Sequence, residues 1–168
     1  MNKYNVDINR ALLKPLYLGL VINVFFPGIM VLVIYYIDTD AGGRTQVPGI
    51  SDFLLWFLAA FAVIDGAAAI YLRQKLMYAP MISSKETFAE NFYQRVTVNS
   101  IIIYALCAAI SVYGLVVYFI FGSFDYLLFF VILSIVAFQI IRPRPGFLEK
   151  VLEAQEKHVE QGRFAPTR

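Results

Sequence analysis

The sequence predicts an all-α membrane protein with four transmembrane helices, both termini in the cytoplasm, and an amphipathic cytoplasmic helix at the C-terminus. Three observations lead to this fold class. The 168 residues are 60% hydrophobic, four long stretches contain no Lys or Arg, and the basic residues gather on one side of these stretches. Even a domain of about 150 residues buries only about 70% of the surface that its unfolded chain exposes, so a soluble fold could not hide so many apolar side chains.

The four stretches without Lys or Arg are residues 16–37, 53–72, 101–122 and 124–141. Each is long enough to span a membrane, because about 20 apolar residues in a helix cross about 30 Å of hydrocarbon. We predict transmembrane helices at about 16–37, 53–72, 96–122 and 124–141, so that residues 1–142 form one four-helix bundle. The first is a retained helix, since its apolar run is too long for a signal peptide and no small-residue cleavage pattern follows it.

The distribution of charge predicts the orientation. All 14 Lys and Arg residues except Arg44 lie before the first helix, between the second and third, or after the fourth. Because basic residues stay on the cytoplasmic side, we expect both termini in the cytoplasm of a multi-pass protein in the bacterial cytoplasmic (inner) membrane. The net charge of only +2, with no basic stripe on one face, gives no indication of nucleic-acid binding.

The first helix carries one polar residue near a proline. Pro15 is suited to open the helix. Asn23 and Pro27 lie one turn apart; Pro27 removes a backbone hydrogen bond, and Asn23 is placed to satisfy the freed carbonyl. We interpret the pair as a kink and packing feature, with a substrate site as the alternative. The following connection, residues 38–52, is rich in Gly, Pro and Asp and is expected to be an exposed loop.

The second helix contains Asp65, an ionisable acid well inside a membrane run. It lies about 12 Å below Arg73 along a helix. Charged residues at this depth usually face protein or water and mark a function. Ala62, Gly66 and Ala69 share its face and would let another backbone approach closely. We expect Asp65 to bond to a Tyr, Asn or Ser of a neighbouring helix; the alternative is an ion or proton role.

The third helix is predicted to pack closely on its neighbours. Its start at 84–87, SKET, is expected to run continuously into the membrane segment. Asn99 could pair with Gln139 across the bundle. A tight turn at 122–123 makes the third and fourth helices antiparallel neighbours. A face of small residues is the expected packing surface, since membrane helices associate through such faces: Ala105, Ala108, Ser111 and Gly114.

This helix also resembles a known one. Residues 105–116 read ALCAAISVYGLV, which is similar to the pattern A-L-x-E-A-x-x-x-Y-G-L-V in the proton-carrying helix of proteolipid subunit c of rotary ATP synthases and vacuolar-type ATPases. Together with FQIIRPRPGFLEKVL, the region resembles a group of uncharacterised bacterial four-helix membrane proteins with a subunit-c-like third helix. The resemblance implies a packing helix of the proteolipid kind. Ala108 stands where the pattern has its carboxylate, which disfavours a working rotor subunit.

The C-terminal segment, residues 143–168, is predicted to be a cytoplasmic tail with a helix at about 146–161. Between Glu149 and Glu160 it holds four Glu against two Lys. An acidic helix is a poor ligand for anionic lipid, so we expect this one to dock on protein. His158 is expected to be solvated. The apolar residues that would face the partner follow at helical spacing: Leu148, Val151, Leu152 and Val159.

Catalytic patterns are missing from the sequence. It has no Ser-His-Asp or Cys-His constellation, no Gly-rich phosphate loop and no metal-spaced cluster, and Cys107 is its single cysteine. We therefore expect no enzyme and no cofactor. The leading hypothesis is a non-catalytic membrane subunit or assembly partner of a larger complex, in contact with lipid and with other subunits or further copies of itself. The alternatives are an oligomeric ion- or proton-handling protein centred on Asp65 and, more weakly, an accessory of a lipid- or small-molecule-binding membrane enzyme.

Overall fold

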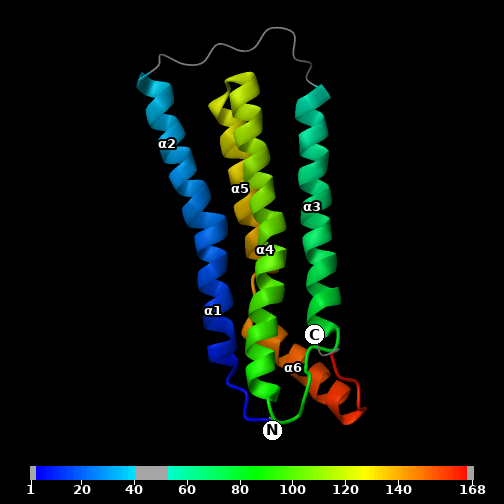
Figure 1. The fold of residues 1–168 in the computed structure, drawn as a ribbon. Coiled ribbons are helices and arrows are strands. Elements are labelled where there is room, and N and C mark those ends of the chain that lie inside the picture. Colours follow the sequence, from blue (N-terminus) through cyan, green and yellow to red (C-terminus); the bar gives the residue numbers. More distant parts are fainter. Residues whose placement is uncertain (1–2, 41–52, 166–168) are drawn as a thin grey trace.

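The structure is a computed structural model that describes residues 3–40 and 53–165. These residues form helices and no strand (Figure 1). Four helical segments are long and apolar enough to cross a membrane: Ile8–Ile37, Phe53–Tyr78, Phe88–Phe121 and Phe124–Ile141. The prediction of an all-α, multi-pass membrane protein is therefore confirmed. Most of the expected outer loop, including Arg44, lies outside the described residues.

The first span begins a full two turns before its predicted start. It consists of α1 (Ile8–Leu20), a π-helical turn η1 (Val21–Phe25) and α2 (Phe26–Asp40). Asp7 caps α1, because its Oδ1 accepts hydrogen bonds from the backbone N–H groups of Asn9 (2.9 Å) and Arg10 (3.3 Å). Pro15 consequently lies buried inside α1 and does not open the helix.

The second and third spans are also longer than their apolar cores. Helix α3 covers Phe53–Tyr78, and α4 covers Phe88–Phe121. With 34 residues, α4 is about 51 Å long, more than a bilayer's hydrocarbon needs. It begins directly after Thr87, so the helix start expected at 84–87 does run on into the membrane segment. Both helices thus extend past their apolar stretches at the end of the bundle where the termini lie.

A two-residue turn joins α4 to α5 (Phe124–Ile141). Gly122 ends α4 in the left-handed conformation, with φ of 67°, and its N–H bonds to the carbonyl of Tyr118 at 2.8 Å. Ser123 then precedes α5. The turn falls where the sequence predicts it, and α4 and α5 are antiparallel neighbours (Figure 1).

Helix α4 is the centre of the bundle and packs against α5, α3 and α1 (Figure 1). Two glycines permit the closest approaches. A Cβ on Gly114 would lie 2.7 Å from Phe130 Cβ of α5, and one on Gly19 of α1 would collide with the rings of Phe138 and Tyr104. The last helix, α6 (Pro145–Glu160), lies across the end of the bundle where both ends of the chain are found, in contact with α1 and α3.

Candidate functional site

The intramembrane carboxylate is bonded to a tyrosine. Tyr113 of α4 donates its hydroxyl to Asp65 Oδ2 of α3 at 2.6 Å. Both side chains are half-buried. The acceptor is therefore held by a neighbouring helix, as the structural interpretation of Asp65 expects. Tyr113 belongs to the Tyr-Gly step of the small-residue helix, so the bond fixes α3 against the residue next to the close-packed Gly114.

Other polar side chains inside the spans bond mainly to backbone carbonyls. Ser134 of α5 donates to the carbonyl of Cys107 on α4 at 2.7 Å, and Ser111 donates to that of Ala108 at 2.7 Å. Asn23 lies fully buried in η1 and donates Nδ2 to the carbonyl of Gly19 at 3.3 Å. Asn23 therefore acts within the irregular turn. The sequence predicts that it satisfies the carbonyl that Pro27 leaves without a partner, but the carbonyl that it satisfies belongs to Gly19. These bonds link or shape helices.

The suggested pairing of Asn99 with Gln139 does not occur. Asn99 donates Nδ2 to the carbonyl of Leu76 at 3.0 Å and approaches Met81 Sδ at 3.3 Å, so it ties α4 to the end of α3. Gln139 is exposed on α5. The reason is helix rotation: α5 turns Ser134 and Phe138 toward α4, and Gln139 follows Phe138 by about 100°, which places it off that face.

The predicted packing faces are only partly used. On α3, Ala62 and Ala69 are buried, whereas a Cβ on Gly66 would meet nothing within 4 Å. On α4, Ser111 is buried and Ala108 is half-buried, but Ala105 is exposed and does not belong to the packing face. Gly66 thus borders open space rather than a second backbone.

The apolar side of α6 is covered by this chain itself. Four side chains that were expected to dock on a partner have exposed fractions of 5% or less: Leu148, Val151, Leu152 and Val159. They join the cluster at the end of the bundle that contains Met77, Ile82 and Phe88. The tail helix therefore packs on the bundle of its own chain, and these residues are not free to receive another subunit, although the docking prediction required that they be.

Gln155 anchors α6 to the connection between α3 and α4. Its Oε1 accepts from the backbone N–H of Met81 at 2.9 Å, and its Nε2 donates to the carbonyls of Ala79 (2.9 Å) and Met77 (3.2 Å). The ring of His158 lies with Nε2 3.0 Å from the carbonyl of Tyr78, so this histidine is half-buried rather than solvated. One side chain thus satisfies three backbone groups that have no hydrogen-bond partner within a helix.

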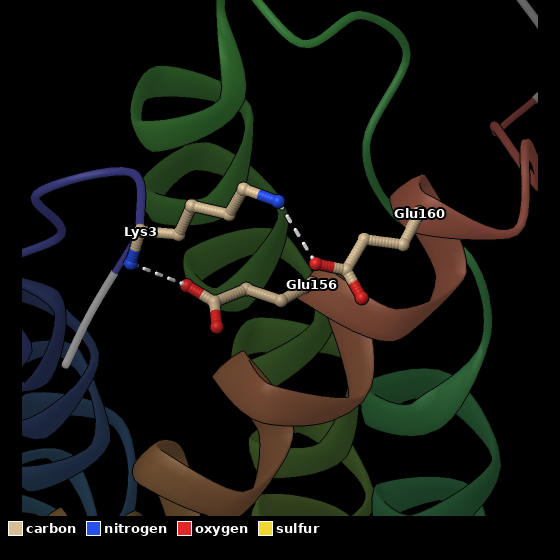
Figure 2. Close-up of polar contacts among 3 residues, drawn as sticks. All are labelled: Lys3, Glu156 and Glu160. Carbon is tan, nitrogen blue, oxygen red and sulfur yellow. Dashed lines mark hydrogen bonds and ion pairs between the residues drawn. The ribbon is translucent and has the colours of Figure 1, made fainter.

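The start of the chain is tied to the same helix (Figure 2). The backbone N–H of Lys3 donates to Glu156 Oε1 at 3.0 Å, and Lys3 Nζ pairs with Glu160 Oε1 at 3.0 Å. The Glu160 carboxylate raises the pKa of Lys3 above its usual value, chiefly through this hydrogen bond. Because both side chains are more than half exposed, the ion pair contributes little to stability. It shows where the start of the chain lies against α6.

Sequence reasoning missed the residues that depend on neighbours. Tyr113 as the partner of Asp65, Gly19 beneath Phe138, and Gln155 as an anchor each need the register between two helices. In the described part of the chain, no group of three His, Cys, Asp or Glu side chains is placed to hold a metal ion. The chain matches no protein-family model, and comparisons with curated proteins and with solved structures gave no match.

Proposed function

We propose that this chain is a non-catalytic membrane subunit, or assembly partner, of a larger complex in the bacterial inner membrane, with both termini in the cytoplasm. The observation that carries the proposal is a pair of open apolar grooves on the membrane-facing surface, each containing a glycine at which a Cβ would meet no atom within 4 Å. Such grooves are suited to receive transmembrane helices of another subunit. The proteolipid-like third helix serves in this proposal as the internal packing core.

The first groove lies between α2 and α5. It has a volume of about 680 Å³, and its walls include Phe25 of η1, Ile29 and Leu32 of α2, and Leu128 of α5. Gly28 lies in this groove, and a Cβ there would meet nothing within 4 Å. The main contacts of α2 are with η1 and α5, and its upper end leans away from α4 in Figure 1.

The second groove lies between α3, α4 and α5. It has a volume of about 170 Å³ and is lined by Ala62, Gly66 and Ile70 of α3, by Ile110, and by Leu133 and Ala137 of α5. Gly66 again has open space where a side chain would stand. Small residues on a membrane helix let a second backbone approach within van der Waals contact, which is the main source of helix association where lipid and protein are equally apolar.

The polar side chains inside the spans support assembly over transport. Asp65, Ser111 and Ser134 each have a bond to a specific neighbour. These bonds do not form a continuous chain of titratable groups, which a proton path through a membrane generally uses. In this proposal, the polar groups fix the bundle so that its outer grooves keep their shape for a partner.

A second candidate is an oligomeric ion- or proton-handling protein centred on Asp65. The observation that favours it is the incomplete burial of both Asp65 and Tyr113. A carboxylate in this position is accessible to a neighbouring copy or to an ion. The two candidates separate in proteoliposomes: loss of a measurable ion flux in Asp65→Asn, with stability unchanged, would establish the second and displace the first.

The assembly proposal is tested by affinity purification from native membranes in mild detergent, followed by mass spectrometry. Gly28→Leu and Gly66→Leu each place a side chain in a groove, at a position where its Cβ meets no atom within 4 Å. We expect each to lose a membrane protein that co-purifies with the unaltered chain. Ala105→Leu is the matched control, because it enlarges an exposed α4 position outside both grooves. Loss of the same protein in Ala105→Leu, or its retention in both glycine variants, would refute the proposal.

A further inference from the structure

A polar pocket opens between α1 and α4 near the end of the bundle where both termini lie. Its volume is about 450 Å³. It is distinct from the two apolar grooves and from the Asp65–Tyr113 pair. Three residues of α1 and four of α4 line it: Arg10, Ala11, Lys14, Glu90, Tyr93, Gln94 and Thr97.

The helical repeat places the charged groups around one space. Arg10 and Lys14 are one turn apart on α1, and Glu90 and Gln94 are one turn apart on α4, so each helix turns a polar face toward the cavity. The guanidinium of Arg10 lies 5.3 Å from the centre of the Tyr93 ring. The hydroxyl oxygen of Tyr93 accepts a hydrogen bond from the backbone N–H of Asp7, with 2.9 Å between oxygen and nitrogen. This bond holds in place the ring that Arg10 contacts.

The pocket offers more positive charge than its own residues neutralise. It holds two cations and one carboxylate. Within residues 3–40 and 53–165, the ion pair formed is Lys3–Glu160, and neither Arg10 nor Lys14 is paired. A guanidinium, an ammonium and the Gln94 amide together supply many N–H donors. Charge-assisted bonds from such donors to phosphate oxygens are among the stronger hydrogen bonds in proteins, so a ligand that carries a phosphate matches this donor set.

The depth of the pocket selects the source of that phosphate. The uncharged run of the first span begins at Leu16, which puts Lys14 about 3 Å and Arg10 about 9 Å outside it along the helix. The polar layer of a bilayer is about 5 to 8 Å thick on each side of the hydrocarbon. The backbone of Lys14 therefore lies within the headgroup layer and that of Arg10 lies at its outer edge, from which the long Arg10 side chain reaches the headgroups. Basic pockets between transmembrane helices at this level bind anionic lipid.

We propose that the pocket formed by Arg10, Lys14 and Gln94 binds the phosphate-bearing headgroup of an anionic phospholipid in the adjacent leaflet. The excess of cations over Glu90 favours an anionic headgroup over a zwitterionic one. The lipid's acyl chains would continue along the apolar surface of α1 that begins beyond Lys14. The site uses residues of neither apolar groove and stands independently of the assembly role.

The test is native mass spectrometry of the full-length protein in detergent, titrated with phosphatidylglycerol or phosphatidylcholine. We expect phosphatidylglycerol to bind more tightly, and the double variant Arg10→Gln/Lys14→Gln to weaken it at least tenfold. The matched control, Lys85→Gln/Lys150→Gln, removes two exposed charges outside the pocket and should leave binding unchanged. Glu90→Gln should tighten binding, since it removes the like charge. Unchanged thermal unfolding would verify that the pocket variants fold.

Four results would overturn the proposal. Equal affinity for both lipids would remove the charge argument. An equal loss in the control variant would reduce the effect to general surface charge. Displacement of phosphatidylglycerol by millimolar inorganic phosphate would assign the pocket to a free anion instead of a lipid. Weaker phosphatidylglycerol binding in Glu90→Gln would likewise contradict an anionic headgroup, because it would give the carboxylate an attractive role.

Discussion

At the scale of single residues, the bond between Tyr113 and Asp65 holds the one carboxylate that lies deep within a described span. A hydrogen bond between membrane helices contributes on average about 0.6 kcal/mol and at most about 1.7 kcal/mol, because the separated helices find other partners. The Tyr113–Asp65 distance of 2.6 Å places this bond among the short ones. Its main consequence is specificity: it sets the rotation of α3 against α4.

A double-mutant cycle on Asp65 and Tyr113 tests this role. We expect Tyr113→Phe to lower the unfolding free energy by about 0.5–1.5 kcal/mol in the unaltered chain and to have almost no effect in Asp65→Leu, since the bond is then already lost. Asp65→Asn keeps an oxygen that accepts from Tyr113 and should be nearly silent. Unfolding in detergent by a graded denaturant gives these values. Equal effects of Tyr113→Phe in both backgrounds would mean that the two side chains do not interact.

The glycines provide a second residue-scale comparison. Gly114→Ala places a methyl group 2.7 Å from Phe130 Cβ and 3.1 Å from the backbone oxygen of Leu127. Overpacking of this kind costs about 1–3 kcal/mol. The same substitution at Gly28 meets no atom within 4 Å and gains up to about 1 kcal/mol of helix propensity. We expect the midpoint temperature of thermal unfolding of the purified protein to be lowered by Gly114→Ala and to be unchanged or raised by Gly28→Ala. A lower midpoint for Gly28→Ala than for Gly114→Ala would contradict the described packing.

At the scale of elements, α6 closes the end of the bundle that carries the termini. Its apolar side is buried by α1, α3 and the connection after α3. Gln155 bonds to two backbone groups of that connection and to the carbonyl of Met77 in the last turn of α3, and the backbone N–H of Ala165 bonds to the carbonyl of Ile82 at 2.8 Å. Because these backbone groups have no helix partners, their satisfaction depends on α6 staying in place.

Replacing Gln155 tests the closure. Gln155→Leu keeps the size and apolar packing but strands the N–H of Met81 and the carbonyls of Ala79 and Met77, at about 1–3 kcal/mol for each buried group left unpaired. We expect faster amide hydrogen exchange throughout α6 and residues 77–82, with the spans unaffected. Lys150→Leu, on the exposed side of α6, is the control. Unchanged exchange in Gln155→Leu would show that the apolar contacts alone hold α6.

The elements also show how far the sequence alone reaches. The hydropathy of the spans predicts their number and, for 124–141, the bounds of α5. For α1, α3 and α4, hydropathy predicts helices that are too short. The ends of these helices carry charged residues such as Arg10, Lys75 and Arg95, and their sequences therefore resemble loops. Those ends are helical because α6 and the N-terminal segment pack against them. A single sequence holds no signal for such contacts between distant segments.

Site residues follow the same division. The sequence singles out Asp65 because an acid in an apolar run is unusual, but its partner Tyr113 depends on the register of α3 against α4. The small-residue face of α4 is predicted, yet its rotation is not: Ala105 is exposed, while Ser111 and Gly114 are buried. Alanines one turn apart are equivalent in a sequence pattern and differ once neighbouring helices occupy particular sides.

At the scale of the whole molecule, most of the described bonds between distant segments gather at the end of the bundle that carries both termini. The N-terminal segment, α6 and the end of α3 are joined by side-chain and backbone bonds (Figures 1 and 2). Along the spans, α2 and α3 flank the α4–α5 pair, and an apolar groove lies on either side. The described chain is thus bonded together where its ends meet and carries its open apolar grooves along the spans.

The orientation of the molecule is tested with reporter fusions. All 14 Lys and Arg residues except Arg44 lie on the side of the termini or in the connections on that side. We expect a fluorescent protein fused after Arg168 to be active and an alkaline phosphatase at the same position to be inactive. Phosphatase inserted beside Arg44 should be active. Phosphatase activity from the C-terminal fusion would invert the orientation and place the lipid pocket in the other leaflet.

The central claim, that the grooves receive helices of another subunit, is tested most directly by photo-crosslinking in living cells. A photoreactive amino acid is placed at Leu32 in the first groove, at Val63 in the second, and at Ala60 and Ala105 outside both. We expect Leu32 and Val63 to yield adducts with a different membrane protein, abolished by Gly28→Leu and Gly66→Leu respectively, and the outside positions to yield none. Adducts from the groove positions with lipid alone, or with second copies of this chain alone, would contradict the claim.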